Sequence, residues 1–183
     1  VVVEIQECSN LGIEVLPPDL NESLAHFTVV DPKTIRFGLT AIKGIGEAAV
    51  REIIEVRERE GKFTSIENFA KRVPAKILNK KSIESLAFSG AFGELGERNA
   101  IASNYDEISG YAKNVQSSVS EGQSDMFEMM GGDSAEELKF VKVVPASPSQ
   151  KLKWEKQYLG LYVSGHPLQG LREYFKMKGK LIS

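Results

Sequence analysis

The sequence predicts a mainly α-helical protein with a small β-hairpin near its N-terminus. Apolar residues recur at helical spacing in residues 79–88 and 98–112. Two alternating or β-branched runs, His26–Val30 and Thr34–Phe37, flank the turn sequence 31–33 and predict the hairpin. Hydrophobic residues make up 42% of the 183 positions, which is enough to form a core. We therefore expect a helical body joined to one small piece of sheet.

Local signals place the remaining elements in order along the chain. Proline, glycine and capping residues mark where each element stops or starts. The expected elements are a helix closed by Asn10, a strand Gly12–Leu16, helical residues Leu39–Glu60 interrupted at Gly44–Gly46, a helix 66–72 capped by Ser65, a helix Asn79–Phe88, a helix 98–112, a short strand Val141–Val144, and a helix Ser149–Leu161 with Trp154 and Tyr158 on one face.

Composition divides the chain into four parts. Residues 1–38 hold the hairpin, and residues 39–112 form a helical domain built around two turns. Residues 113–138 are rich in Ser, Gly, Gln and acidic residues, so they bury too little apolar surface to offset chain entropy and predict a flexible linker. Residues 139–183 form a C-terminal helical segment.

Several residue types exclude whole classes of function. The single cysteine, Cys8, permits no internal disulfide and is interpreted as a packing residue. His26 and His166 have no second ligand at metal-binding spacing, and Asp19 and Asp31 stand among turn residues. No apolar run is long enough to cross a membrane. The sequence opens in a helical pattern without Met, which indicates an excised fragment.

Charge is unevenly distributed along the chain. Residues 33–81 hold twelve Lys or Arg against six Asp or Glu, and residues 139–183 hold nine against two. Residues 94–137 are acidic, with ten acids and two bases. The two basic stretches are candidate phosphate-facing regions, and the alternative is a solvated surface with chance clustering.

The clearest binding motif is Gly44-Ile45-Gly46, which lies between two helical stretches. Glycine permits positive φ and close backbone approach, and the helix that follows presents unpaired N–H groups and a positive dipole end. A phosphate oxygen can be held there without any base contact. Lys43 adds a positive charge, and Ile45 is expected to fix the turn in the core. An ordinary helical hairpin with a glycine turn is the alternative.

This arrangement resembles the helix-hairpin-helix motif of proteins that bind DNA without sequence specificity. The following stretch, Gly61–Phe69, is similar to the segment that leads to a second hairpin in tandem versions of the motif. Here the second hairpin falls at Pro74–Asn79 and is followed by Lys80 and Lys81. It lacks the two glycines and is therefore degenerate.

A second candidate motif lies inside the expected linker. Gln123, Met126 and Phe127 resemble the bacterial sliding-clamp-binding motif, in which a glutamine precedes two variable and two large apolar residues. Met supplies adaptable packing, Phe a rigid anchor, and Gln a hydrogen bond at the edge of a groove. The alternative is a chance apolar patch in a polar tract.

Four separated segments are similar to the alpha subunit of bacterial DNA polymerase III, the C-family replicative polymerase, and together they cover essentially the whole chain. The segments are Cys8–Asn21, Ile35–Gly46, Lys81–Gly96 and Trp154–Leu168. The resemblance implies that residues 1–38 belong to the distal fingers, residues 39–112 to a tandem helix-hairpin-helix domain, and the rest to a clamp-binding region.

The same resemblance implies function and partners. The whole protein would be a cytoplasmic DNA-directed DNA polymerase, a nucleotidyltransferase that extends a primer with deoxynucleoside triphosphates and magnesium. Its expected partners are duplex DNA, the sliding clamp (beta subunit) and other replicase subunits, with no membrane. The family's metal-binding carboxylates lie upstream, so this fragment is expected to need no cofactor and to be inactive alone. The rival hypotheses are a stand-alone helix-hairpin-helix adaptor, a nuclease or ligase fragment, and a purely structural module.

Overall fold

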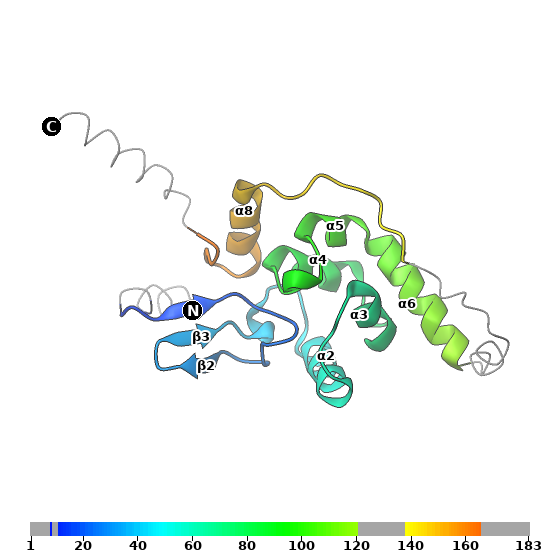
Figure 1. Cartoon of the computed structure of the whole chain (residues 1–183), viewed down its shortest axis with the longest axis horizontal. Helices are drawn as coiled ribbons and strands as arrows, with labels where there is room; N and C mark the ends of the chain where they lie inside the picture. The colour runs from blue at the N-terminus through cyan, green and yellow to red at the C-terminus, as the bar shows by residue number, and fades with distance from the viewer. Residues whose placement is uncertain (1–7, 9–10, 121–137, 166–183) are drawn as a thin grey trace.

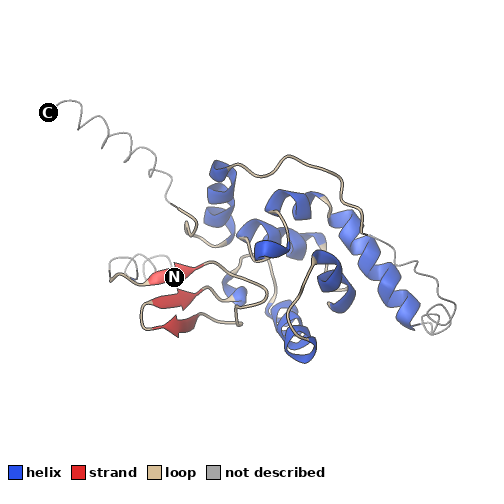
Figure 2. Cartoon of the chain, in the orientation of Figure 1, coloured by secondary structure: helices blue, strands red, loops and turns tan. Residues whose placement is uncertain are grey.

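A small sheet lies beside a body of short helices (Figures 1 and 2). The structure is a computed structural model that describes residues 8, 11–120 and 138–165, and for 118–120 only the backbone. Within these residues, no helix is both long and apolar enough to cross a lipid bilayer. The predicted fold class, mainly helical with a small β-hairpin near the N-terminus, is confirmed.

The sheet has three strands in the order β1-β3-β2. The predicted hairpin is its antiparallel pair, β2 (Thr28–Asp31) and β3 (Thr34–Arg36). The strand predicted to follow Gly12 is β1 (Glu14–Leu16), which pairs with β3 in parallel. This pairing joins residues about twenty positions apart, so no local sequence signal predicted it.

The helices succeed one another with short turns between them. They are η1 (Leu39–Ala41), α2 (Glu47–Glu60), α3 (Ile66–Arg72), α4 (Lys80–Ser89), η2 (Gly93–Leu95), α5 (Arg98–Ser103), α6 (Tyr105–Ser120) and α8 (Pro148–Tyr158). The predicted cap of α3 is confirmed, since the Ser65 side chain accepts from the Asn68 amide.

Of the helical stretch expected over Leu39–Glu60, the part after Gly46 is confirmed as α2, and the part before Gly44 is wrong. Residues 39–41 form only one 3-10 turn, because their backbone is tied to the loop that precedes the hairpin strands. The Leu39 amide donates to Leu24, and both the amide and the hydroxyl of Thr40 donate to the Ala25 carbonyl. The Lys43 amide, which would donate to the Leu39 carbonyl in an α-helix, donates instead to the Tyr158 carbonyl, so the turn does not extend into an α-helix.

The helix expected over 98–112 is divided at Asn104 into α5 and α6. Asn104 is fully buried, and its side-chain amide donates to the carbonyls of Ala100 and Val141 while its oxygen accepts from the Val141 amide. These bonds also explain why residues 141–144 form no strand. Their backbone is satisfied by side chains, including Asn99 at the Val144 carbonyl, and by no neighbouring strand.

The first residues of the expected linker are helical, because α6 continues to Ser120. The side chain of Gln116 fixes this part of α6 to the body. It accepts from the Ala75 amide at 2.9 Å and donates to the Ala70 and Val73 carbonyls at 3.1 and 2.9 Å. A polar side chain thus replaces the apolar contacts whose scarcity favoured a linker.

One core connects the helices, with aromatic rings at its centre. Phe69 is fully buried between Phe63 and Phe92, at centroid distances of 5.1 and 5.2 Å in edge-to-face geometry. Such pairs stabilise a core by about 0.5–1.5 kcal/mol each beyond the area they bury.

Polar side chains fix the N-terminal part of the chain to this helical core. The buried Arg57 donates to the carbonyls of Leu20 and Ser23 at 2.7 and 2.8 Å. Asn21 exchanges two hydrogen bonds with the backbone of Phe63. The segment that leads into the hairpin strands is therefore bonded directly to α2 and to the turn that follows it.

Candidate nucleic-acid interface

The turn between η1 and α2 has the geometry predicted for it. Gly44 has a φ of +99°, which only glycine adopts without strain, and Gly46 is the N-cap of α2 with extended backbone. Ile45 is only 8% exposed and belongs to the core, as expected. Lys43, Gly44 and Gly46 are exposed, so the outer side of the turn faces solvent.

The N-terminus of α2 differs from those of its neighbours. In α3, α4, α5 and α8, the side chain of the N-cap residue accepts a hydrogen bond from a backbone amide of the first turn. These N-cap residues are Ser65, Asn79, Glu97 and Ser147, respectively. Gly46 offers no such side chain, and α2 has no side-chain cap. Its first amides therefore face solvent at the positive end of the helix dipole, where an anion is favoured.

One acidic residue stands beside these amides. Glu47, the first residue of α2, forms an ion pair with Arg51 one turn along the helix, with 2.7 Å between Oε1 and the guanidinium nitrogen. Both side chains are more than half exposed. Arg51 balances the charge that would otherwise repel an anion at this end of α2.

The structure brings Lys81 to the glycine turn. A Cβ added to Gly44 would lie 3.5 Å from Cε of Lys81 and would overlap the hydroxyl of Ser85. Lys81 and Ser85 are successive residues on one face of α4. The turn therefore packs directly against the helix of the second predicted hairpin, and Lys43, Gly44, Gly46 and Lys81 form one exposed group.

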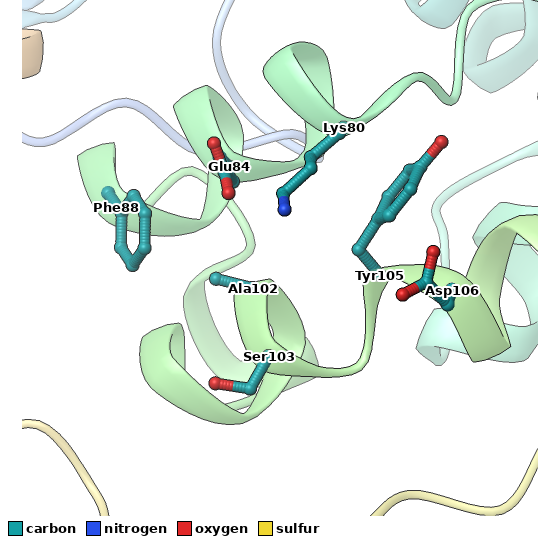
Figure 3. Close-up of a pocket in the computed structure, with 7 residues that line it drawn as sticks. All are labelled: Lys80, Glu84, Phe88, Ala102, Ser103, Tyr105 and Asp106. Carbon is teal, nitrogen blue, oxygen red and sulfur yellow. The ribbon is translucent and has the colours of Figure 1, made fainter.

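Lys80 lies on a different face of α4. It lines a polar pocket of about 280 Å³ with Glu84 and Phe88 from α4 and with residues of α5 and α6 (Figure 3). Its ammonium group points into this pocket, next to Glu84 and Tyr105 (Figure 3). Lys80 and Lys81, which were both predicted to bind DNA, thus lie apart: Lys80 lines this pocket, and Lys81 lies beside Gly44.

The second hairpin, at Pro74–Asn79, is closed to an anion at the start of its helix. Asn79 caps α4 by accepting from the Ser82 amide, and Ile77 and Leu78 are buried. Lys76 is exposed in the turn. The second hairpin therefore differs from the first in two ways. It lacks the two glycines, and its N-cap side chain, Asn79, accepts from an amide whose equivalent in α2 has no side-chain partner.

Helix α8 contacts the glycine turn, which sequence reasoning missed. The Lys43 amide donates to the Tyr158 carbonyl at 2.9 Å. The rings of Trp154 and Tyr158 pack on Phe88 of α4, with centroids 4.3 and 5.6 Å away, and this confirms their predicted shared face. Burial and the charge of Glu84 raise the pKa of Tyr158 above its ordinary value.

A buried ion pair fixes α8 to α5. Glu155 is 1% exposed, and one of its oxygens lies 3.0 Å from the Arg98 guanidinium. The other oxygen accepts from the amides of Val163 and Ser164 at 2.9 Å each. Burial alone would raise the pKa of Glu155, but these amides and Arg98 outweigh it and hold the pKa below the ordinary value.

The remaining predictions concern turn residues, metal ligands and the clamp peptide. Asp19 and Asp31 are turn residues as expected, accepting from the amides of Asn21 and Lys33. Across the part of the chain that the structure describes, no three His, Cys, Asp or Glu side chains lie where they could hold a metal ion. The predicted clamp peptide at residues 123–127 lies outside the described residues.

Comparison with known proteins agrees with this geometry. Residues 12–102 match a family described as a helix-hairpin-helix motif. The chain is 37% identical over 186 residues to the DNA polymerase III subunit alpha of Vibrio cholerae, and 39% identical over 172 residues to that of Thermus aquaticus. The Escherichia coli K12 subunit is 35% identical over 182 residues.

The chain is homologous to a segment of these alpha subunits. The three alignments cover 92–100% of this chain but only 14–16% of the alpha subunits. The family resemblance recognised in the sequence is thereby confirmed over nearly its whole length. A similarity this continuous argues against a stand-alone adaptor, because a shared hairpin alone would align only residues near 12–102.

Proposed function

We propose that this chain is a non-catalytic segment of a bacterial replicative DNA polymerase, and that it holds duplex DNA by the phosphate backbone. The observation that carries the proposal is the uncapped N-terminus of α2 beside Gly44 and Gly46. Lys43 from the turn and Lys81 from α4 add positive charge to the same exposed group. The homology to alpha subunits supplies the context of replication in the cytoplasm.

The chemistry of this group favours phosphate over bases. Main-chain amides and lysines bind phosphate oxygens without reading base edges, so the contact carries no sequence information. A Cβ at Gly46 would meet nothing within 4 Å, so the space where an N-cap side chain would begin is open. We expect non-specific affinity, with a Kd of roughly 10⁻⁴ to 10⁻⁶ M that weakens steeply as salt increases.

Gly46→Asp tests this assignment, because it separates folding from binding. The extended backbone of Gly46 suits an N-cap carboxylate, which accepts from the helix amides and raises stability by a few tenths of a kcal/mol, about the gain expected over glycine. The same carboxylate occupies those amides and repels phosphate. The melting temperature should therefore hold or rise while duplex affinity falls.

A matched variant controls for the added charge. Thr64 is exposed just before α3, so Thr64→Asp places the same charge near the start of another helix. Duplex affinity should then stay close to that of the parent chain. If titration with duplex DNA shifts amide resonances elsewhere and leaves residues 43–50 unchanged, the glycine turn is not the binding site.

We also propose that residues 123–127 tether the polymerase to its sliding clamp. The support is the residue pattern, Gln123 followed by the apolar pair Met126 and Phe127. A short peptide of this kind is expected to bind with a Kd near micromolar, which is about 8 kcal/mol. Surface plasmon resonance on the 183-residue chain would measure Phe127→Ala, expected to lose about 2 kcal/mol, against Ser124→Ala at a variable position.

The polymerase activity belongs, in this proposal, to parts of the longer protein outside this chain. Primer extension with deoxynucleoside triphosphates needs carboxylates that hold magnesium ions. Among the described residues, no three His, Cys, Asp or Glu side chains form a cluster that could hold a metal ion. Primer extension by the purified chain, above a contaminant control, would contradict the proposal that the polymerase activity lies outside this chain.

A further inference from the structure

The described part of the C-terminal region presents a surface of uniform positive charge. Residues 138–165 contain five lysines, Lys139, Lys142, Lys151, Lys153 and Lys156, of which all but the half-buried Lys151 are exposed. The one acidic residue of this segment, Glu155, is 1% exposed and paired with Arg98. Within residues 138–165, the described part of the basic stretch, no acidic residue is therefore exposed.

These lysines have no ion-pair partner among the described residues. The Lys156 ammonium donates to the Gly160 carbonyl at 3.1 Å and lies 5.6 Å from the centre of the Tyr162 ring, which leaves its charge uncompensated. By contrast, Lys62 pairs with Glu22 and Arg51 with Glu47. The positive charge of the segment is available to a polyanion.

The backbone that carries the lysines is fixed in place. The segment passes over α5 on its way to α8 (Figure 1), and side chains of α5 and the residues around it bind its backbone. Asn104 pairs with Val141, and Glu97 accepts from the Ala146 amide at 3.0 Å. Ser147 and Gln150 then form a capping box that starts α8. The lysines are thus held without the entropy loss of ordering a loop.

The C-terminal end of α8 contacts the glycine turn. Its last carbonyl, on Tyr158, accepts from the Lys43 amide, and its rings rest on the same α4 that brings Lys81 to Gly44. Glu155 and Trp154 take the side of α8 that faces the body, while Lys153 and Lys156 are exposed. The C-terminal end of α8 and the glycine turn are therefore direct neighbours.

We propose that Lys153 and Lys156 bind further phosphates of the duplex that the glycine turn holds. The inference rests on the proposed function and extends the DNA-binding surface from the glycine turn to α8. Lysine suits this task, because its compact charge on a flexible stem contacts phosphate without fixed geometry. The ligand class is the phosphodiester backbone of duplex DNA, and each neutralised phosphate releases counterions.

The test is the salt dependence of duplex binding by the 183-residue chain. Log affinity falls against log salt with a slope of about −0.9 for each phosphate contacted. The double variant Lys153→Gln with Lys156→Gln should make this slope shallower by about 2 and weaken binding at low salt. The melting temperature should stay close to that of the parent, because both side chains are exposed and the contacts of Lys156 with the Gly160 carbonyl and the Tyr162 ring lie at the surface.

A matched pair removes the same charge elsewhere. Lys71 on α3 and Lys113 on α6 are exposed, and their double Gln variant should leave the slope unchanged. If both pairs change the slope equally, the effect is one of net charge and the inference about α8 is wrong.

Gly46→Asp separates this inference from the proposed function. Loss of binding in Gly46→Asp, with no change in the α8 pair, would overturn the inference and keep the glycine turn as the site. Dependence on the α8 pair, with Gly46→Asp binding as the parent does, would support the inference and overturn the turn assignment. A chain that fails to bind duplex DNA at 50 mM salt would overturn both.

Discussion

The hydroxyl of Ser85 lies directly beneath Gly44, and among the described residues it is the buried side-chain polar atom without a hydrogen-bond partner. Ser85 is 1% exposed, so water does not satisfy it from outside. The contact explains why position 44 must lack a side chain, beyond its φ of +99°. It also joins the two halves of the helix-hairpin-helix region at their point of closest approach.

Gly44→Ala should destabilise the protein. The alanine methyl would overlap the Ser85 hydroxyl and would adopt a positive φ that side chains rarely tolerate. We expect a loss of more than about 1 kcal/mol in the free energy of unfolding, measured by urea denaturation. Gly46→Ala, with ordinary φ and open space, is the control and should cost less. Equal losses would contradict this account of the turn.

Ser85→Ala should leave stability unchanged or raise it. The substitution removes a buried hydroxyl that has no partner, and such a group costs about 1–3 kcal/mol when left unsatisfied. Ser89 provides the contrast, since its hydroxyl donates to the Leu86 carbonyl at 3.0 Å. Ser89→Ala should therefore be the more destabilising of the two in thermal unfolding. The reverse order would mean that the Ser85 hydroxyl has a partner in solution.

Glu155→Gln should make the protein less stable at neutral pH and less sensitive to acid. The pKa of Glu155 is held below its ordinary value of 4.5, so its carboxylate stabilises the fold above that pH. This stabilisation is lost as the pH falls through the native pKa. Removing the charge beside Arg98 should cost about 3 kcal/mol at pH 7, and the variant should then lose less on acidification.

Urea unfolding at a series of pH values would measure this profile. Glu94→Gln is the matched control, because Glu94 is exposed and has no ion pair among the described residues. Its profile should follow that of the parent. A Glu155→Gln profile parallel to the parent would show that this carboxylate does not titrate differently in the folded and unfolded chains.

Gln116→Ala should destabilise the end of α6. The side chain makes three hydrogen bonds to the backbone at the end of α3 and in the turn after it, and their loss should cost on the order of 1–2 kcal/mol. Lys113→Ala, one turn earlier and exposed, is the control. Amide exchange in residues 113–117 should accelerate only in the Gln116 variant. Rapid exchange there in the parent would favour the flexible linker that composition predicted.

Local signals predicted the elements whose causes are local. The Ser65 cap, the glycine turn at 44–46 and the shared face of Trp154 and Tyr158 each depend on residues a few positions apart. DNA binding was predicted for Lys43, Gly44, Ile45, Gly46, Lys80 and Lys81, and it stays a prediction. That Lys81 lies beside Gly44 while Lys80 lines a separate pocket depends on how α4 packs against the turn, which neighbouring residues do not determine.

Hydrogen bonds between residues far apart in the sequence account for the differences between the predicted and the observed elements. Asn104 bonds Val141 and thereby divides a helix and replaces a strand, and Gln116 keeps helical a stretch that composition would leave unfolded. The bond between the Lys43 amide and the Tyr158 carbonyl, which joins α8 to the turn, spans more than a hundred residues. Each of these distant contacts is a hydrogen bond, and hydrophobic periodicity does not predict hydrogen bonds.

Arg57 bonds to the carbonyls of Leu20 and Ser23, and Asn21 bonds to Phe63. These bonds have a consequence for the cooperativity of unfolding. The apolar strand residues Val15, Leu16 and Ile35 are only partly buried, and Val29 and Val30 are exposed, so the strands have little core of their own. Their persistence depends on α2 through the carbonyls of Leu20 and Ser23. The slowly exchanging amides of the sheet and of α2 should then open in one event, as a single foldon with one free energy of opening.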